Sequence, residues 1–400
     1  MADTVVTLGF LPLIDCAVPV VAHELGFAAA EGLTLDLQRE ASWAAVRDKL
    51  AFGLLDAAHI LAPLPLAIHL GLGGMPAVAM TVPMALGLGG NAITVSTALY
   101  ARLLDADPEA MAGPRGGSAR ALKRVIAADR AAGRPPLSFA TVFPFSSHTY
   151  ELRLWLASAG IDPDRDVNLG VVAPARMVES LASGWIDGYC VGEPWNLRAV
   201  QRGVGAIVAT KGDIWPASPE KVLGLRAEWA NRQPDLTAAL VRALVRAAQW
   251  ADAAENRDAL ADLLADPGYV GTSPDILRMA LGGRPVLRPG AAPEALESHV
   301  FFRWQATFPW VSRAAWLLAQ MTRWDQAAVP AVERLAVAAQ VWRPDLYRAA
   351  VAPLGLAVPA EDLAVAGAAA APHAVAAAGG GSVEVGPDAF LTGEVFDPRR

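Results

Sequence analysis

The sequence is poor in cysteine and in charged residues. Only two of its 400 residues are cysteine, Cys16 and Cys190, which is too few for a disulfide framework and matches no zinc-binding spacing. Two free thiols fit a reducing compartment. Charged residues make up 18% of the chain, and its net charge is −7. The sequence contains no run of lysine and arginine residues. Direct binding of nucleic acid is therefore disfavoured.

Long apolar runs are also missing, although the chain is 54% hydrophobic. A membrane-spanning helix needs about 18 or more consecutive apolar residues. The best candidate, residues 75–88, is shorter, contains Pro83 and ends at Gly89 and Gly90. We interpret this stretch as buried core, and we expect no membrane insertion.

An export signal is not recognisable at the start of the sequence. Such a signal has a basic segment, an apolar segment and a small-residue cleavage site. Here Met1-Ala2-Asp3 contains no basic residue, and residues 4–10 already have the pattern of a strand. The sequence therefore predicts a cytoplasmic protein. The alternative is a mature periplasmic protein that carries a starting methionine.

Catalytic signatures are missing as well. The sequence contains no GxSxG, no HExxH, no phosphate-binding Walker loop and no GxGxxG preceded by a strand. Its six histidines are scattered, and no pair of carboxylates is marked as an acid and a base. We therefore expect a binding protein that is not an enzyme and that has no cofactor and no metal.

What the sequence does contain is a regular alternation of strand-like and helix-like segments, which is typical of parallel sheets covered by helices. Residues 235–264, 312–320 and 327–339 are helical in pattern. Residues 354–381 are biased toward alanine, glycine and proline, and they predict a weak helix with a flexible linker. The last residues, 382–400, regain alternating apolar positions and can dock on the body.

Several loops between a strand and a helix carry candidate ligand-binding residues. In open α/β sheets ligands bind at such junctions, where helix N-termini offer free N–H donors to an anion. Ser42 is a good N-cap, and it places Trp43 at the first helical position. Trp43 can form a wall of a binding site and supply a backbone N–H, or it can simply lie in the core behind a capped helix.

Two further junctions offer polar side chains. His148 follows a strand and opens a helix, where it can bind an anion or have a structural role. Lys221 lies in a proline-constrained loop before an apolar strand. It is either a fixed positive charge in a site or an exposed lysine.

Taken together, these loops strongly resemble those of the nitrate/bicarbonate-binding family of solute-binding proteins. The resemblance covers about residues 4–350, and the segments that carry it are residues 8–16, 39–49, 56–63, 90–94, 191–196, 212–216 and 219–224. It implies the α/β, two-lobed type II periplasmic-binding-protein fold with the ligand cleft between the lobes. The corresponding boundaries place residues 1–92 and 211–350 in lobe 1 and residues 93–210 in lobe 2. Residues 351–400 then form an Ala/Gly-rich linker and a C-terminal segment.

The resemblance also implies a binding site. Nitrate binders of the family hold the anion with residues at the positions of Trp43, His148, Pro174 and Lys221, and Asn91 falls near the position of a family glutamine. Bicarbonate binders have an acidic residue at the position of Lys221 and recruit calcium there. Lys221 therefore favours nitrate or nitrite. Nitrate is flat, monovalent and a poor acceptor of hydrogen bonds, so one positive charge and a few donors suit it.

Most members of the family have a signal peptide and serve an ABC importer. Without such a signal, this chain resembles the cytoplasmic nitrate sensors of bacterial assimilation operons. Those sensors hold an ANTAR-type RNA-binding antiterminator protein inactive until nitrate or nitrite arrives. We take this as the leading hypothesis, and the periplasmic component of a nitrate importer as the alternative. A third possibility, a pyrimidine-precursor synthase, needs a cysteine-rich motif that the sequence lacks.

Overall fold

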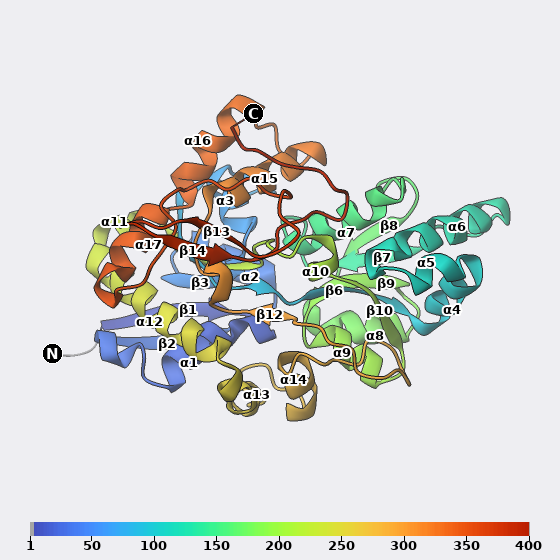
Figure 1. The fold of residues 1–400 in the computed structure, drawn as a ribbon, viewed down its shortest axis with the longest axis horizontal. Coiled ribbons are helices and arrows are strands. Elements are labelled where there is room, and N and C mark those ends of the chain that lie inside the picture. The colour runs from blue at the N-terminus through green and yellow to red at the C-terminus, as the bar shows by residue number, and fades with distance from the viewer. Residues whose placement is uncertain (1–3, 400) are drawn as a thin grey trace.

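The computed structural model describes residues 4–399 and contains two five-stranded sheets, each covered by helices. Figure 1 shows the two sheets side by side, so that the molecule consists of two lobes. We call the sheet that contains β1, with its helices, lobe 1, and the sheet that contains β7, with its helices, lobe 2. The predicted α/β, two-lobed periplasmic-binding-protein fold is confirmed.

Lobe 1 is built on a sheet with the strand order β2-β1-β3-β11-β4. Its strands are β1 (Thr4–Phe10), β2 (Leu33–Arg39), β3 (Ala57–Leu61), β4 (Met80–Ala85) and β11 (Lys221–Arg226). The strand β1 pairs in parallel with β2 and β3, whereas β11 runs antiparallel between β3 and β4. The carboxyl ends of β1, β2 and β3 therefore meet the beginning of β11 at one edge of the sheet.

Lobe 2 is built on a sheet with the strand order β10-β6-β9-β7-β8. Its strands are β6 (Asn91–Ser96), β7 (Ser138–Thr141), β8 (Asn168–Val171), β9 (Gly188–Gly192) and β10 (Gly205–Thr210). The strand β7 is parallel to β8 and β9, and β6 is antiparallel to β9 and β10. The beginning of β6 thus lies beside the carboxyl ends of β9 and β10. The chain passes from lobe 1 to lobe 2 between β4 and β6 and returns between β10 and β11.

Helices cover both sheets. Those that follow strands of the lobe 1 sheet are α1 (Ala17–Glu24), α2 (Trp43–Ala51), α3 (Leu64–His69), α11 (Ala227–Arg232) and α12 (Pro234–Asp252). Those of the lobe 2 stretch are α4 (Thr97–Ala106), α5 (Pro108–Ala112), α6 (Ser118–Ala131), α7 (Ser147–Ser158), α8 (Met177–Ala182), α9 (Trp195–Gln201) and α10 (Lys211–Ile214). Five more follow α12: α13 (Arg257–Leu264), α14 (Pro274–Leu281), α15 (Val311–Arg323), α16 (Ala331–Val341) and α17 (Pro344–Val351).

Helix α12 illustrates how the sequence positions these elements. Pro234 stands at its first turn, where the missing N–H costs nothing. Leu240, Val241, Leu244 and Val245 then recur at helical spacing and are completely buried. Their face contacts α1 and α17, which anchors the helix to the lobe 1 core.

A short antiparallel pair of strands joins a later part of the chain to the segment that leads from lobe 1 to lobe 2. The strand β5 (Leu88–Gly89) pairs with β12 (His299–Val300). Gly89 and Gly90 have φ angles of +88° and +90°, which residues with a side chain rarely adopt. Because the Ser298 carbonyl lies directly against Gly89, this position has no room for a Cβ. The chain can therefore approach β12 closely just before Asn91.

The C-terminal segment differs from the predicted weak helix. Among residues 355–399 the structure contains no helix, but it contains the hairpin of β13 (His373–Ala376) and β14 (Ser382–Val385). The prediction of a weak helix in residues 354–381 is wrong. Alanine favours helices, but Pro359, Gly367, Pro372 and Gly379 divide this segment into short runs. In Figure 1 this segment, drawn in red, crosses over lobe 1 and reaches α10.

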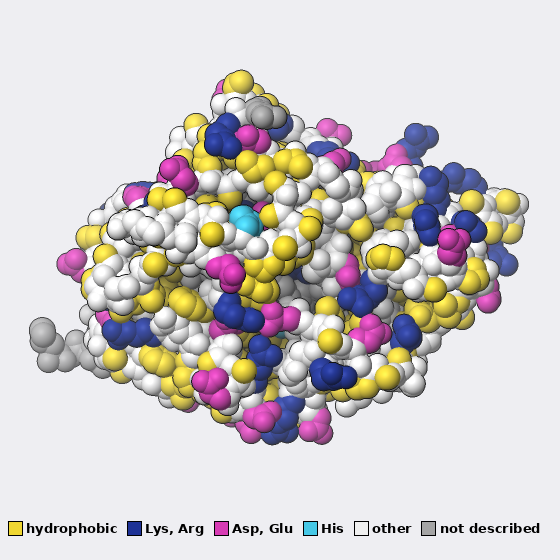
Figure 2. Space-filling view, viewed as in Figure 1, with side chains coloured by type: hydrophobic (Ala, Val, Ile, Leu, Met, Phe, Trp, Pro, Cys, Tyr) yellow, Lys and Arg dark blue, Asp and Glu magenta, His cyan; other side chains and the backbone are white. Residues whose placement is uncertain are grey.

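No helix of residues 4–399 is long and apolar enough to span a membrane. The space-filling view of one face shows acidic, basic and apolar side chains interspersed, with basic side chains gathered over α6 (Figure 2). Near this helix, Arg102 of α4 and Arg134, which follows α6, both bind Asp129 of α6.

Candidate functional site

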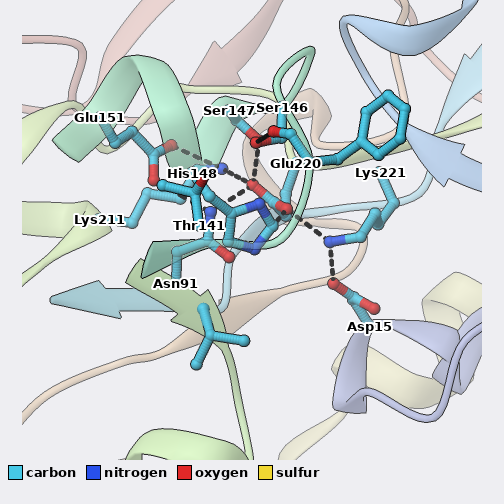
Figure 3. A network of polar contacts seen from close by, with 12 residues as sticks. Asp15, Asn91, Thr141, Ser146, Ser147, His148, Glu151, Lys211, Glu220 and Lys221 are labelled. Carbon is cyan, nitrogen blue, oxygen red and sulfur yellow. Dashed lines mark hydrogen bonds and ion pairs between the residues drawn. The ribbon is translucent and has the colours of Figure 1, made fainter. Parts of the chain in front are cut away.

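The candidate site lies where the strand ends of the two lobes face each other, and Figure 3 shows its polar side chains. Lobe 1 contributes residues that follow β1 and β2 or begin β11. Lobe 2 contributes the first residue of β6 and the first turn of α7, which follows β7. The two sets meet in a network of buried hydrogen bonds and ion pairs.

Lys221 is the first residue of β11, and its ammonium group is almost completely buried. Its Nζ atom donates to Asp15 Oδ2 at 2.6 Å and to Glu220 Oε1 at 2.5 Å. Burial by itself would lower the pKa of Lys221, but the Asp15 and Glu220 carboxylates outweigh that effect and raise it. Lys221 is therefore a fixed positive charge, and the alternative of an exposed lysine is excluded.

Trp43 is placed by the N-cap of α2. The Ser42 hydroxyl accepts a hydrogen bond from the Ala45 N–H at 3.2 Å, which starts the helix at Trp43. Lys221 Nζ lies 5.2 Å from the centroid of the Trp43 ring, within the range of a cation–π contact. Trp43 is thus a core residue and a neighbour of the buried lysine, and its role as a wall of a binding site stays a prediction.

His148 lies in the first turn of α7, which is capped by Ser146. Its Nε2 atom is 3.4 Å from Glu220 Oε1, without the geometry of a hydrogen bond. Burial, together with the nearby lysines, lowers the pKa of His148 to about 3. At neutral pH His148 is therefore an uncharged ring with one N–H to donate.

Glu220 occupies the centre of the network (Figure 3). Besides Lys221, its carboxylate accepts hydrogen bonds from three groups of lobe 2: Asn91 Nδ2 at 2.5 Å, Ser147 Oγ at 2.5 Å and Lys211 Nζ at 2.6 Å. Burial opposes its charge, but His148 and the two lysines outweigh that effect and hold the pKa of Glu220 well below its usual range. One carboxylate thus connects lobe 1 to lobe 2.

Glu151 is a second buried carboxylate on the same side. It lies one helical turn after His148 on α7 and accepts from Asn91 Nδ2 at 3.0 Å, from Ser218 Oγ at 3.1 Å and from Lys211 Nζ at 3.1 Å. Burial, with a smaller contribution from the charge of Glu220, raises the pKa of Glu151.

Several buried polar atoms around the network lack a hydrogen-bond partner within residues 4–399. They include Trp43 Nε1, both ring nitrogens of His148 and Asn91 Oδ1. An unpaired buried donor costs free energy, so a set of them at one place points to a group that the protein alone does not supply. N–H donors beside a lysine suit a small anion.

The predicted residues are brought together to different extents. Asn91, His148 and Lys221 all contact or closely approach Glu220, and Trp43 faces Lys221. Pro174 is buried in the turn after β8, the strand next to β7. Within residues 4–399 no hydrogen bond or ion pair joins Pro174 to the network, so its role in the site stays a prediction.

Other members of the network were not predicted from the sequence. They are Asp15, His59, Glu151, Lys211 and Glu220. Two of them had a usable signal: Glu220 is adjacent to Lys221, and Glu151 is three residues after His148, on the same face of a helix. Asp15 and His59 meet the others only through contacts between distant parts of the chain, whereas Lys211 is nine residues before Glu220.

A metal centre has no support from the side chains. Among residues 4–399 no group of three or more histidine, cysteine, aspartate or glutamate side chains is arranged to hold a metal ion. The carboxylates of the network are instead paired with lysines.

The fold and the position of the site define a two-lobed binding protein of the periplasmic type, with the polar network between its lobes. The chain belongs to the NMT1-like family, whose sequence profile matches residues 2–265. It is also similar in structure to the periplasmic nitrate-binding protein NrtA from Synechocystis PCC 6803. The TM-score is 0.84 at 28% identity, and the match covers 99% of this chain and 96% of that one.

Curated relatives are longer proteins. The chain is 39% identical over 352 residues to the nitrate import ATP-binding protein NrtC of Synechocystis sp. (strain PCC 6803). It is 34% identical over 350 residues to the bicarbonate transport ATP-binding protein CmpC of Synechococcus elongatus (strain PCC 7942). Each match covers 87% of this chain, but the chain spans only about half of each relative, 50% and 49% respectively.

Proposed function

We propose that this protein binds nitrate between its two lobes and that it serves a nitrate import system as the solute-binding part. The observation that carries the proposal is the buried ammonium group of Lys221, next to the unpartnered N–H groups of Trp43 and His148. In this role the anion is bound and released unchanged, so the protein is not an enzyme and needs no cofactor.

The choice of nitrate over bicarbonate rests on Lys221. Bicarbonate binders of the resembled family have an acidic residue at that position, whereas a lysine there supplies the charge that nitrate needs. Two of the compared proteins support the same choice: NrtC is named for nitrate import, and NrtA is named for nitrate binding. Nitrite has the same charge and is the second anion to test.

A cytoplasmic sensor is the second candidate function, and it comes from the sequence. In that role the nitrate-free protein would bind an ANTAR-type RNA-binding antiterminator, and nitrate would release it. None of the compared relatives is named as a sensor, so the importer role is the better supported of the two. The cytoplasmic location belongs to this second proposal.

Titration calorimetry tests the ligand. We expect nitrate to bind without any added metal, and bicarbonate with calcium to give no signal. Lys221→Glu replaces an attractive charge with a repulsive one and should weaken nitrate binding by roughly 100-fold or more. The matched control is Lys123→Glu on α6, where the lysine is exposed. Calcium-dependent binding of bicarbonate without a nitrate signal would contradict the assignment.

A separate experiment decides between the two roles. Size-exclusion chromatography with a purified ANTAR-type antiterminator, with and without millimolar nitrate, tests the sensor. A complex that forms only without nitrate would establish sensing, since ligand and partner must then weaken each other by the same factor. If no complex forms, and nitrate uptake is lost when the gene is deleted, the importer role stands.

A further inference from the structure

The buried charges of the network do not balance. Three carboxylates, Asp15, Glu151 and Glu220, face two ammonium groups, Lys211 and Lys221. With all five groups ionised, the sum is two minus three, or −1. Each of these residues is at most 7% exposed. A monovalent anion added here would bring the sum to −2, and uncompensated charge in a protein interior is costly.

Two of the histidines near the network, His148 and His299, do not supply the missing positive charge. Burial is the main cause that lowers the pKa of His148 to about 3 and that of His299 to about 4, so both rings are neutral near pH 7. His59 contacts Asp15 through Nε2 at 2.9 Å, away from the two glutamates. The thiol of Cys190 on β9 is protonated, because burial raises its pKa well above 9.

Glu151 and Glu220 form a pair of carboxylates that share their donors. Both accept from Asn91 Nδ2, and both bind Lys211 Nζ. Two carboxylates that share donors in a dry site titrate as a pair, and one of them holds a proton more readily than an isolated acid. Glu151 is the natural holder, because Glu220 has Lys221 in addition to Lys211.

We propose that the site binds its anion together with one proton, which the Glu151–Glu220 pair takes up. The proposal rests on the proposed function, since it describes how that same site accepts a negative charge. The proton comes from solvent and forms an O–H bond on the carboxylate of Glu151, while the anion is bound by Lys221 and its neighbours. The site thus takes up one anion and one proton together, and the sum of the buried charges stays at −1.

Proton linkage has a measurable sign. Because binding takes up a proton, the affinity for nitrate falls as the pH rises above the pKa of the pair in the empty site. One proton per anion corresponds to a loss of up to tenfold in affinity per pH unit. Calorimetry with nitrate at one pH, in buffers of different ionisation enthalpy, counts the protons directly. We expect a number near one between pH 7 and 8.5.

Two variants make the test specific. Glu151→Gln keeps the shape but cannot ionise, so it should bind nitrate with no proton uptake and with an affinity that does not depend on pH. Glu193→Gln is the matched control: Glu193 is buried at the end of β9 and also titrates, but it is not part of the pair. This variant should keep the proton uptake of the unmodified protein.

The outcomes separate this inference from the proposed function. Nitrate binding with no proton uptake and a flat pH profile from 6 to 9 would overturn the inference and leave nitrate binding intact. Proton uptake that persists in Glu151→Gln and disappears in Glu193→Gln would also overturn it. If nitrate does not bind at any pH, the result would instead contradict the proposed function itself.

Discussion

At the scale of single residues, Lys221 has two tasks that compete. Its ammonium group neutralises Asp15 and Glu220, and in the proposed function it also attracts an anion. The sequence could predict the second task, because a lysine before an apolar strand is a local signal. The pairing with Asp15 could not be predicted, because Asp15 is 206 residues away in the chain.

The same reasoning explains which site residues the sequence revealed. Trp43 and His148 begin helices behind serine caps, and a cap is visible in a few consecutive residues. Lys211 begins α10 in a similar way, behind the capping box of Thr210 and Asp213, but only the packed structure shows that it binds Glu220 and Glu151. Local signals identify where a residue stands on its element, whereas partners depend on how the elements pack.

Glu193 gives a prediction at this scale. Burial raises the pKa of its carboxyl from 4.5 to about 8, so the folded protein keeps a proton that the unfolded chain loses above pH 4.5. The unmodified protein should therefore lose stability as the pH rises from 4.5 to 8, by at most about 1.4 kcal/mol per pH unit. Glu193→Gln mimics the protonated form and avoids this loss.

Denaturant unfolding of both proteins at several pH values measures the effect. The stability of Glu193→Gln relative to the unmodified protein should rise from pH 4.5 and level off above pH 8. Glu228→Gln, at an exposed site paired with Arg232, serves as the control and should show no such trend. A constant difference across the pH range would mean that Glu193 does not hold a proton in the fold.

At the scale of elements, the alternation of strands and helices was predictable, whereas the course of residues 354–381 was not. The regular segments have apolar residues at the spacing of a strand or a helix, and those residues are the buried ones, as on α12. Residues 354–381 have little such periodicity, whereas the alternating Val383 and Val385 of β14 are buried. Contacts with other elements set the course of the segment. Phe390 lies against both Trp215 and Trp316, at centroid distances of 4.7 Å and 5.6 Å.

Phe390→Ala should therefore detach part of this segment. Phe390 is only 6% exposed, and removing a buried phenylalanine typically costs about 3–5 kcal/mol. Phe52→Ala, at a position 65% exposed, should cost far less and serves as the matched control. Thermal unfolding gives the stability, and limited proteolysis should show cleavage after residue 354 in Phe390→Ala alone. Equal stability of the two variants would mean that the aromatic contacts do not hold the segment.

At the scale of the whole molecule, the network joins the lobes. Glu220, directly before the first residue of β11 in lobe 1, is bonded to Asn91, Ser147 and Lys211 of lobe 2. The described form is thus a closed one, and a ligand between the lobes favours closure by its greater affinity for that form.

Small-angle X-ray scattering tests this on the intact protein. We expect the radius of gyration to fall when nitrate is added at saturating concentration, and Lys221→Glu to show no such change. Scattering curves that coincide with and without nitrate, at a concentration where calorimetry shows saturation, would mean that binding occurs without lobe closure.

The C-terminal segment adds a second connection between the lobes, apart from the strand crossings. Phe390 packs on Trp316 of α15, while the next residue, Leu391, donates its N–H to the Ile214 carbonyl of α10 at 2.8 Å and lies against Gly116 of lobe 2. Such a segment limits how far the lobes can separate, unless its contacts with one lobe break. The free energy needed to break those contacts then adds to the free energy of opening the two lobes. Substitutions in the tail would thereby tune how tightly an anion is held without touching a single residue of the anion site.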